Sequence, residues 1–137
     1  MATYDELQVG AAASFTKTIS ETDVYLFAGV TGDMNPAHVD AVSAADGMFK
    51  QRIAHGMLTA SFISTVLAMK LPGPGTIYLG QEAQFRAPVF IGDTITARVE
   101  LVEKLEPRRW ARFHTTVTNQ DGKLVVDGHA TVIPPSK

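Results

Sequence analysis

Residues 56–70 read GMLTASFISTVLAMK and carry the clearest helical pattern of the chain. Apolar residues would cover most of the circumference of a helix formed here. The polar residues that precede Lys70 are all small, namely Thr59, Ser61, Ser64 and Thr65. A helix that is apolar nearly all round is a buried helix. We therefore expect residues 56–70 to form the central helix of a core, ended by the LPGPG segment at 71–75.

The segments that follow this helix alternate as strands do. Within residues 76–89, Ile77, Leu79, Ala83 and Phe85 recur with a period of two, and Gln81 interrupts them. Residues 93–106 continue the alternation, and residues 109–119 and 124–133 resemble two more strands around the turn signal QDGK. Because the connections between these strands are short, we expect antiparallel pairing.

The first forty residues predict a strand, a helix and a constrained loop. A short strand is expected at 12–19, and Ser20 and Asp23 have the spacing of a capping box at the start of a helix over 21–31. Gly32 is suited to end that helix. Pro36 disfavours the helical conformation at the residue before it, so residues 33–38 are expected to lie in an irregular loop.

These elements together predict an α+β fold in a single domain, residues 1–137. One mostly buried helix would be wrapped by a sheet of about five antiparallel strands.

Composition excludes several classes of function. A net charge of −2 does not predict attraction to nucleic acid or to an anionic membrane. The chain has no cysteine, which excludes disulfides and thiolate chemistry. We recognise no signal peptide and no apolar stretch of membrane-spanning length, and we expect a cytoplasmic protein.

The sequence predicts neither a metal nor an organic cofactor. No two of the four histidines have metal-ligand spacing. The glycines of residues 71–80 follow a helix and precede a strand, which is the reverse of a dinucleotide-binding fingerprint.

The segment GDMNPAHVD, residues 32–40, holds the candidate chemistry. A carboxylate and an imidazole close together, here Asp33 and His38, can bind one water and share its proton transfers. Histidine suits this task because its pKa lies near neutrality. The residues alone leave open a purely structural reading, in which Asp33 caps a helix and His38 belongs to a turn.

Three segments in order resemble the (R)-specific enoyl-CoA hydratases of the MaoC-like group in the hot-dog superfamily. They are GDMNPAHVD at 32–40, IAHGMLTASF at 53–62 and GQEAQFRAPVFIGDT at 80–94. The resemblance extends from about Val9 to Val132. Ala37 and Arg52 differ from the residues most common in the family, and these differences affect the packing of loops. It implies a long helix cradled by a strongly curved sheet, and a homodimer with active sites near the subunit interface.

The resemblance also implies the reaction and the residues that perform it. The activity would be reversible hydration of trans-2-enoyl-CoA to (3R)-3-hydroxyacyl-CoA without a cofactor. Asp33 and His38 match the catalytic pair, and Asn35 would organise their loop. Gly56 matches the residue whose backbone N–H supports the thioester oxygen, at a helix start where such groups are free.

Further roles follow from the same resemblance. Ser64 matches a supporting residue on the central helix, and Leu67 and Val132 match residues that bound the acyl tail. His55 is expected to hydrogen-bond a nearby loop, and His114 and His129 to face solvent from strands.

Three alternatives remain open at this point. The chain could be a hot-dog acyl-CoA thioesterase, or a dehydratase acting on acyl carrier protein thioesters. It could also be a non-catalytic acyl-binding module, against which the presence of both Asp33 and His38 argues. The acyl chain length and the physiological direction are not determined by the sequence.

Overall fold

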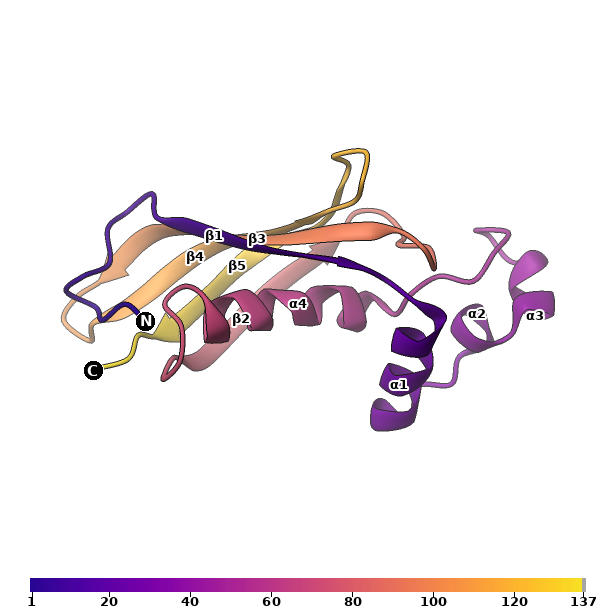
Figure 1. Cartoon of the computed structure of the whole chain (residues 1–137), viewed down its shortest axis with the longest axis horizontal. Coiled ribbons are helices and arrows are strands. Elements are labelled where there is room, and N and C mark those ends of the chain that lie inside the picture. Colours follow the sequence, from indigo (N-terminus) through magenta and orange to yellow (C-terminus); the bar gives the residue numbers. More distant parts are fainter. Residues whose placement is uncertain (137) are drawn as a thin grey trace.

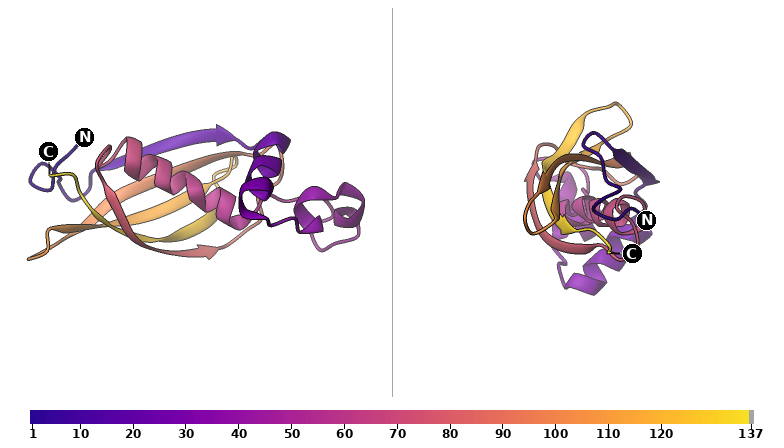
Figure 2. Two further views of the ribbon diagram at one scale, coloured as in Figure 1. Left: turned by 90° about the horizontal axis from the view of Figure 1, so that it is seen from below. Right: turned by 90° about the vertical axis from the view of Figure 1, so that its left-hand side faces the viewer.

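The central helix lies against one face of a curved antiparallel sheet. The computed structural model describes residues 1–136, and Lys137, the last residue of the expected domain, lies outside them. Helix α4 (Gly56–Met69) runs along the concave side of a five-stranded sheet, as Figures 1 and 2 show. The predicted α+β hot-dog architecture is confirmed.

The sheet contains the five strands that the sequence predicts. They are β1 (Ala12–Thr18), β2 (Ile77–Phe85), β3 (Thr94–Leu105), β4 (Trp110–Thr118) and β5 (Leu124–Ile133). Their order is β1-β3-β4-β5-β2, and every neighbouring pair is antiparallel. Strands β1 and β2 therefore form the two edges.

The core fills the space between α4 and the inner face of the sheet. Alternate residues of β3 and β4 are buried there, including Val99 and Phe113, and Ile63 and Leu67 meet them from α4. Complete burial of such an aliphatic or aromatic side chain stabilises the fold by roughly 1.5–3 kcal/mol. The alternation predicted for residues 93–106 and 109–119 is confirmed.

Helix α4 is less enclosed than its apolar sequence predicts. Met57, Ser61, Ser64 and Ala68 are exposed in the single chain, and their spacing of three or four residues places them on one face. This face lies beside strand β2, and residues of both elements line one groove. The expectation of burial nearly all round is thus wrong for an isolated chain.

Helix α1 (Glu21–Thr31) begins and ends as predicted. Ser20 Oγ accepts a hydrogen bond from the backbone N–H of Asp23, and Asp23 Oδ2 accepts one from the N–H of Ser20. Gly32 follows the helix with a φ of 82°, a conformation that glycine adopts without strain. The capping signals therefore fix where the chain turns toward the candidate loop.

That loop is more regular than predicted. Residues 36–39 form a helical turn, α2 (Pro36–Val39), so the expectation of an irregular segment over 33–38 is wrong at its second half. Asn35 Oδ1 accepts from the backbone N–H of Ala37, and proline at the first helical position is already in a helical φ. Helix α3 (Ala41–Ala45) follows, and both lie at one end of the molecule beyond the sheet in Figure 1.

Strand β2 contains a bulge that the sequence alternation did not reveal. Tyr78 pairs with Val132 and Gly80 pairs with Thr131, so Leu79 is an extra residue in β2. An extra residue reverses which side chains face inward. Gln81 therefore points to the inner face of the sheet together with Ala83 and Phe85. The prediction that Ile77 and Leu79 share this inner face with Ala83 and Phe85 is wrong.

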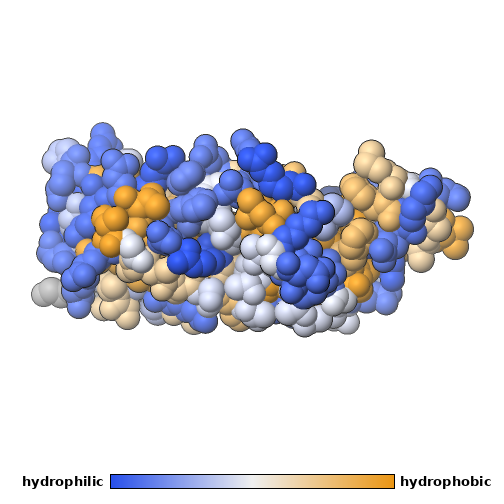
Figure 3. Space-filling model, turned by 90° about the horizontal axis from the view of Figure 1, so that it is seen from above, coloured by the Kyte–Doolittle hydropathy of each residue, from blue (hydrophilic) through white to orange (hydrophobic). Residues whose placement is uncertain are grey.

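The face of the molecule in Figure 3 is mainly polar. Figure 3 shows polar side chains over most of the face it presents, with smaller apolar patches and more apolar surface toward the end that carries the short helices. Val42 and Met48 are among the exposed apolar residues of that end. Among residues 1–136, no helix is both long and apolar enough to cross a membrane.

Candidate active site

Three side chains from two separate segments meet at the N-terminal end of α4. One carboxylate oxygen of Asp33 and one ring nitrogen of each of His38 and His55 lie within 4.8 Å of one another. Asp33 is exposed, whereas His38 and His55 are buried. The predicted pair is thus brought together, and a third group, which the sequence suggested only as a structural residue, lies with it.

The surroundings of His38 fix which ring nitrogen is free. Its Nδ1 lies 2.7 Å from the carbonyl oxygen of Ile53. A carbonyl can only accept, so Nδ1 carries the hydrogen and donates it. In the neutral ring, Nε2 then keeps an unshared electron pair that can receive a proton.

His55 contacts both Asp33 and His38. Its Nε2 lies 3.0 Å from the backbone carbonyl oxygen of Asp33 and donates a hydrogen bond to it. Its ring stacks on that of His38 with centroids 3.9 Å apart, and Phe27 packs against it at 4.9 Å. The prediction that His55 hydrogen-bonds a nearby loop is confirmed. Among the described residues, none forms a hydrogen bond with its buried Nδ1.

Local hydrogen bonds orient Asp33. The backbone N–H of Asn35 donates to Asp33 Oδ1 at 3.2 Å, and Thr31 Oγ1 accepts from the backbone N–H of Asp33 at 3.2 Å. Asn35 also caps α2, which carries His38. One asparagine therefore links the conformation of the carboxylate to the start of the turn that presents the imidazole.

The same three groups are of the kinds that bind metal ions. The sequence spacing gave no sign of them, because His38 and His55 meet only in the fold. Metal binding uses electron pairs in the planes of the rings. The two rings are stacked with an interplanar angle of 29°, and one nitrogen of each, His38 Nδ1 and His55 Nε2, already donates to a backbone carbonyl. Each ring therefore keeps one nitrogen for proton transfer or for an ion.

Gly56 begins α4 immediately after this cluster. His55 is the N-terminal cap residue of α4, and its side chain makes no capping hydrogen bond. The first N–H groups of a helix have no partner within the helix, and the helix dipole favours negative charge there. A Cβ at position 56 would lie 3.0 Å from the ring of Phe85, so glycine allows β2 to approach this helix end closely.

A cavity opens at that helix end. It measures about 350 Å³, and its lining includes Ile53, Gly56, Thr59, Phe85 and Arg86. Ile53 is also the residue whose carbonyl receives the hydrogen bond from His38. The cavity is thus adjacent to the cluster, and the first residue of α4 forms part of the cavity wall.

The predicted supporting residue, Ser64, lies at the surface, and the two predicted acyl-pocket residues lie in the core. Ser64 lines a second groove, between α4 and β2. Leu67 and Val132 are almost fully buried and belong to the hydrophobic core behind that groove. An acyl tail would have to pass from the groove into the core to touch Leu67 and Val132. Their contact with an acyl tail stays a prediction.

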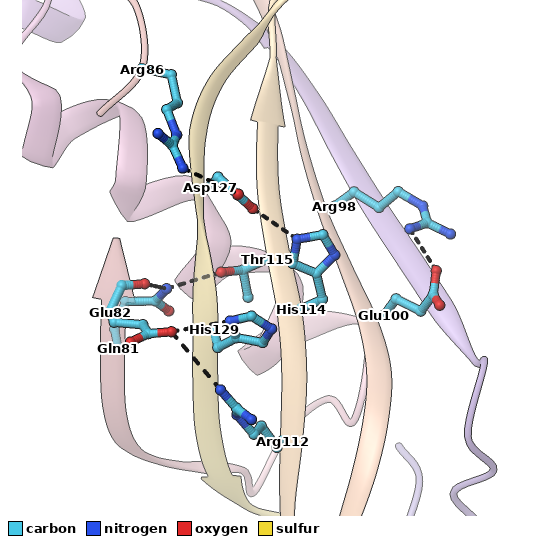
Figure 4. A network of polar contacts seen from close by, with 10 residues as sticks. All are labelled: Gln81, Glu82, Arg86, Arg98, Glu100, Arg112, His114, Thr115, Asp127 and His129. Carbon is cyan, nitrogen blue, oxygen red and sulfur yellow. Dashed lines mark hydrogen bonds and ion pairs between the residues drawn. The ribbon is translucent and has the colours of Figure 1, made fainter. Parts of the chain in front are cut away.

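His114 and His129 lie away from this site, on the outer face of the sheet. Each contacts a carboxylate: His114 Nε2 is 2.8 Å from Asp127 Oδ1, and His129 Nδ1 is 3.1 Å from Glu82 Oε1 (Figure 4). Both side chains are partly exposed, at 40% and 35%. The expectation that they face solvent is confirmed, and the carboxylate partners are an addition to it.

Comparison with known proteins identifies relatives over almost the whole chain. The (R)-specific enoyl-CoA hydratase of Rhodospirillum rubrum is 50% identical over 134 residues, which cover 98% of this chain and 92% of that protein. The 3-hydroxybutyryl-CoA dehydratase of Methylorubrum extorquens is 46% identical, with coverages of 98% and 85%.

A solved structure agrees in three dimensions. The unliganded R-hydratase PhaJ1 from Pseudomonas aeruginosa superposes with a TM-score of 0.94 and 51% identity, covering 98% of this chain and 86% of that one. Residues 6–122 match the family model described as a MaoC like domain. The chain therefore belongs to the MaoC-like family.

Proposed function

We propose that the protein is a hydro-lyase that interconverts trans-2-enoyl-CoA and (3R)-3-hydroxyacyl-CoA. The observation that carries the proposal is the meeting of Asp33 and His38 within 4.8 Å beside the uncapped start of α4. The names of the two relatives point to the same substrate class, and the name of the Rhodospirillum rubrum hydratase supplies the stereochemistry.

The chemistry divides between the two side chains. Hydration adds the oxygen of water to the third acyl carbon and a proton to the second, so one group must accept a proton and another must give one. The proposed water lies between the Asp33 carboxylate and His38 Nε2. Their ligand atoms are within 4.8 Å, and the hydrogen bond from Nδ1 to Ile53 leaves Nε2 free. General acid–base help of this kind accelerates a reaction by roughly 10²–10⁴-fold.

The start of α4 supplies the electrostatic part. Addition to an enoyl thioester places negative charge on the thioester oxygen in the transition state. The backbone N–H of Gly56 is proposed to bind that oxygen, supported by the helix dipole, as in other oxyanion holes. Phe85 and Ile53 line the adjacent cavity with apolar surface, which strengthens such interactions by excluding water.

The assembly and setting are proposals as well. We propose that residues 1–137 act as one domain in a homodimer, which would cover the exposed face of α4 and the free edge of β2. CoA thioesters are intracellular metabolites, and the cytoplasm is the proposed compartment. Acyl carrier protein thioesters share the reacting atoms, so they are the matched second substrate for the assay.

Incubation of the purified protein with crotonyl-CoA tests the proposal. We expect the enoyl absorbance to fall while free thiol stays constant, and (3R)-3-hydroxybutyryl-CoA to accumulate. Release of thiol without loss of enoyl absorbance would show a thioesterase instead. Binding of crotonyl-CoA with neither change would show a non-catalytic acyl-binding protein.

A further inference from the structure

Two histidines and two glutamates lie in one row across the outer face of the sheet. Glu100 of β3 is directly opposite His114 of β4, and His114 is directly opposite His129 of β5. Glu82 of β2 follows on the other side of His129. Residues directly opposite each other on neighbouring strands have Cβ atoms roughly 4.5–5.5 Å apart. Adjacent members of the row are therefore close enough to bind one ion together.

A carboxylate holds each histidine through one ring nitrogen. His114 Nε2 donates to Asp127 Oδ1 at 2.8 Å, and His129 Nδ1 donates to Glu82 Oε1 at 3.1 Å. In the neutral rings, His114 Nδ1 and His129 Nε2 then keep an unshared electron pair. Histidines that bind metal ions usually donate their second N–H to a carboxylate or a carbonyl in this way, which fixes the ring orientation.

The separation of the two rings suits a shared zinc ion. Zinc is usually tetrahedral, with Zn–N bonds of about 2.0–2.1 Å, so two imidazoles on one zinc ion have ring centroids roughly 5 Å apart. The centroids of His114 and His129 are 5.2 Å apart, and the rings are tilted by 33°. Both side chains are partly exposed, at 40% and 35%, so an ion can reach them from solvent.

Two arginines hold the carboxylates that orient these rings. Arg86 Nη2 lies 4.0 Å from Asp127 Oδ2, and Arg112 Nη2 lies 3.9 Å from Glu82 Oε1. The two guanidinium charges are balanced by the two carboxylate charges. A divalent cation that approaches the imidazoles therefore meets no net positive charge from these four side chains.

Glu100 supplies a further oxygen ligand on the third strand. Figure 4 shows Glu100 on the opposite side of His114 from Asp127, which is the side of the free ring nitrogen. Its carboxylate pairs with Arg98 at 2.9 Å, and both side chains of this pair are exposed. Exposed ion pairs contribute little to stability, so the carboxylate can leave Arg98 for an ion.

We propose that His114 Nδ1, His129 Nε2 and the carboxylate of Glu100 bind a zinc ion on the outer face of the sheet. Two imidazoles, a carboxylate and one water complete the tetrahedral coordination that zinc prefers. The ion links β3, β4 and β5. These ligands lie apart from Asp33 and His38, so the site is independent of the proposed hydratase activity.

Calorimetric titration with zinc chloride near neutral pH tests the two imidazoles. The wild type should bind Zn²⁺ at this site, and His114→Gln and His129→Gln should each raise the Kd by roughly tenfold or more. The variant with both changes should lose the site. His38→Gln is the control for the cluster at the start of α4, and its Kd for the outer site should equal that of the wild type.

A pair of carboxylate variants tests the third ligand. Glu100→Gln replaces a charged ligand by a neutral one and should raise the Kd by roughly threefold or more. Glu103→Gln is the matched control, because Glu103 also belongs to β3 but is opposite Arg112. Its Kd should be unchanged. Equal affinities of the two variants would contradict the role of Glu100.

Thermal unfolding gives a second readout. An ion that binds only the folded chain raises the Tm, so Zn²⁺ should raise the Tm of the wild type and not that of the variant with both histidines changed. If that variant does not fold, the two single variants must show the weakened binding. A wild type that binds no Zn²⁺ overturns the inference. Binding that survives in the folded double variant and is lost in His38→Gln overturns it too, because the ion then belongs to the cluster at α4.

Discussion

The imidazole of His55 stacks on that of His38 at 3.9 Å while its Nε2 holds the backbone carbonyl of Asp33. A single buried side chain thus contacts both members of the proposed catalytic pair. It belongs to the segment that leads into α4, so the pair is also tied to the proposed oxygen-binding helix start. We regard His55 as a positioning residue.

Two substitutions of His55 distinguish the contribution of its stacked ring from that of its hydrogen bond to Asp33. His55→Phe keeps a stacked ring but frees the carbonyl of Asp33, and we expect kcat to fall by roughly 10- to 100-fold because the carboxylate loses its position. His55→Gln places an amide N–H near Nε2 and should restore part of that loss. Steady-state kinetics with crotonyl-CoA measures both.

Stability provides the control for this pair of variants. His55 Nδ1 has no partner among the described residues, so replacing the ring by phenyl removes a buried unsatisfied atom along with one hydrogen bond. The free energy of unfolding of His55→Phe should therefore stay within about 1 kcal/mol of the wild type. Wild-type kcat in both variants would show that His55 has no positioning role.

Leu67→Ala tests the core behind the groove. Leu67 is 1% exposed, and removing its buried methyl groups should reduce the free energy of unfolding by about 2–5 kcal/mol. The space created should also favour longer acyl chains. Urea denaturation and a chain-length series measure the two effects.

The matched control for that variant is Leu124→Ala. Leu124 is 37% exposed at the start of β5, so its truncation should cost less than about 1 kcal/mol. If Leu67→Ala folds with an unchanged chain-length preference, the acyl tail does not reach this part of the core.

The His114–Asp127 pair predicts an acid-sensitive component of stability. The hydrogen bond from His114 lowers the pKa of Asp127, and Arg86 adds a weaker effect of the same sign. A carboxyl group whose pKa is lower in the folded state stabilises the fold above its unfolded pKa of about 4. This contribution is lost as the pH falls from about 5 through the folded pKa.

Asp127→Asn should remove that component. The difference in unfolding free energy between wild type and variant should be present at pH 7 and should shrink as the pH falls below about 4. Urea denaturation at several pH values measures it, with Asp46→Asn as an exposed carboxylate control. A difference independent of pH would contradict the assignment.

The free edge of β2 predicts the proposed dimer. Ile77 at its start is 55% exposed, and unpaired edges with apolar residues favour association. Sedimentation at micromolar concentration should give about twice the chain mass of 14.8 kDa. Ile77→Lys should shift the population toward the single-chain mass. A wild type that stays at the single-chain mass as the concentration rises would oppose the proposal.

Elements with strong local signals were predictable from the sequence. The capping box at Ser20 and Asp23 and the glycine at 32 define α1 because they act on neighbouring backbone groups. The apolar pattern of residues 56–70 specifies a core helix, and the alternation in β3 and β4 specifies their inner faces. Asp33 and His38 were recognisable as a pair because they lie close in the sequence.

Features that depend on pairing between distant segments were not predictable in this way. The bulge at Leu79 shifts the phase of β2, and only the register with β5 reveals it, although Gly80 is the residue type that often marks a bulge. The stack of His38 on His55 joins segments that approach only in the fold. The short helix over residues 36–39 does not follow from the effect of Pro36 on Asn35, because the same proline also suits the first position of a helix.

The central claim is that Asp33 and His38 act together on one water, and crotonyl-CoA hydration by Asp33→Asn, His38→Gln and the double variant tests it most directly. Each single variant should keep the fold and a near-normal KM and lose roughly 10²-fold or more in turnover. The double variant should lose much less than the product of the two losses, because the groups act as a unit. Asp40→Asn, which keeps a capping side chain before α3, should retain wild-type turnover. Near-normal hydration by both well-folded single variants would contradict the account.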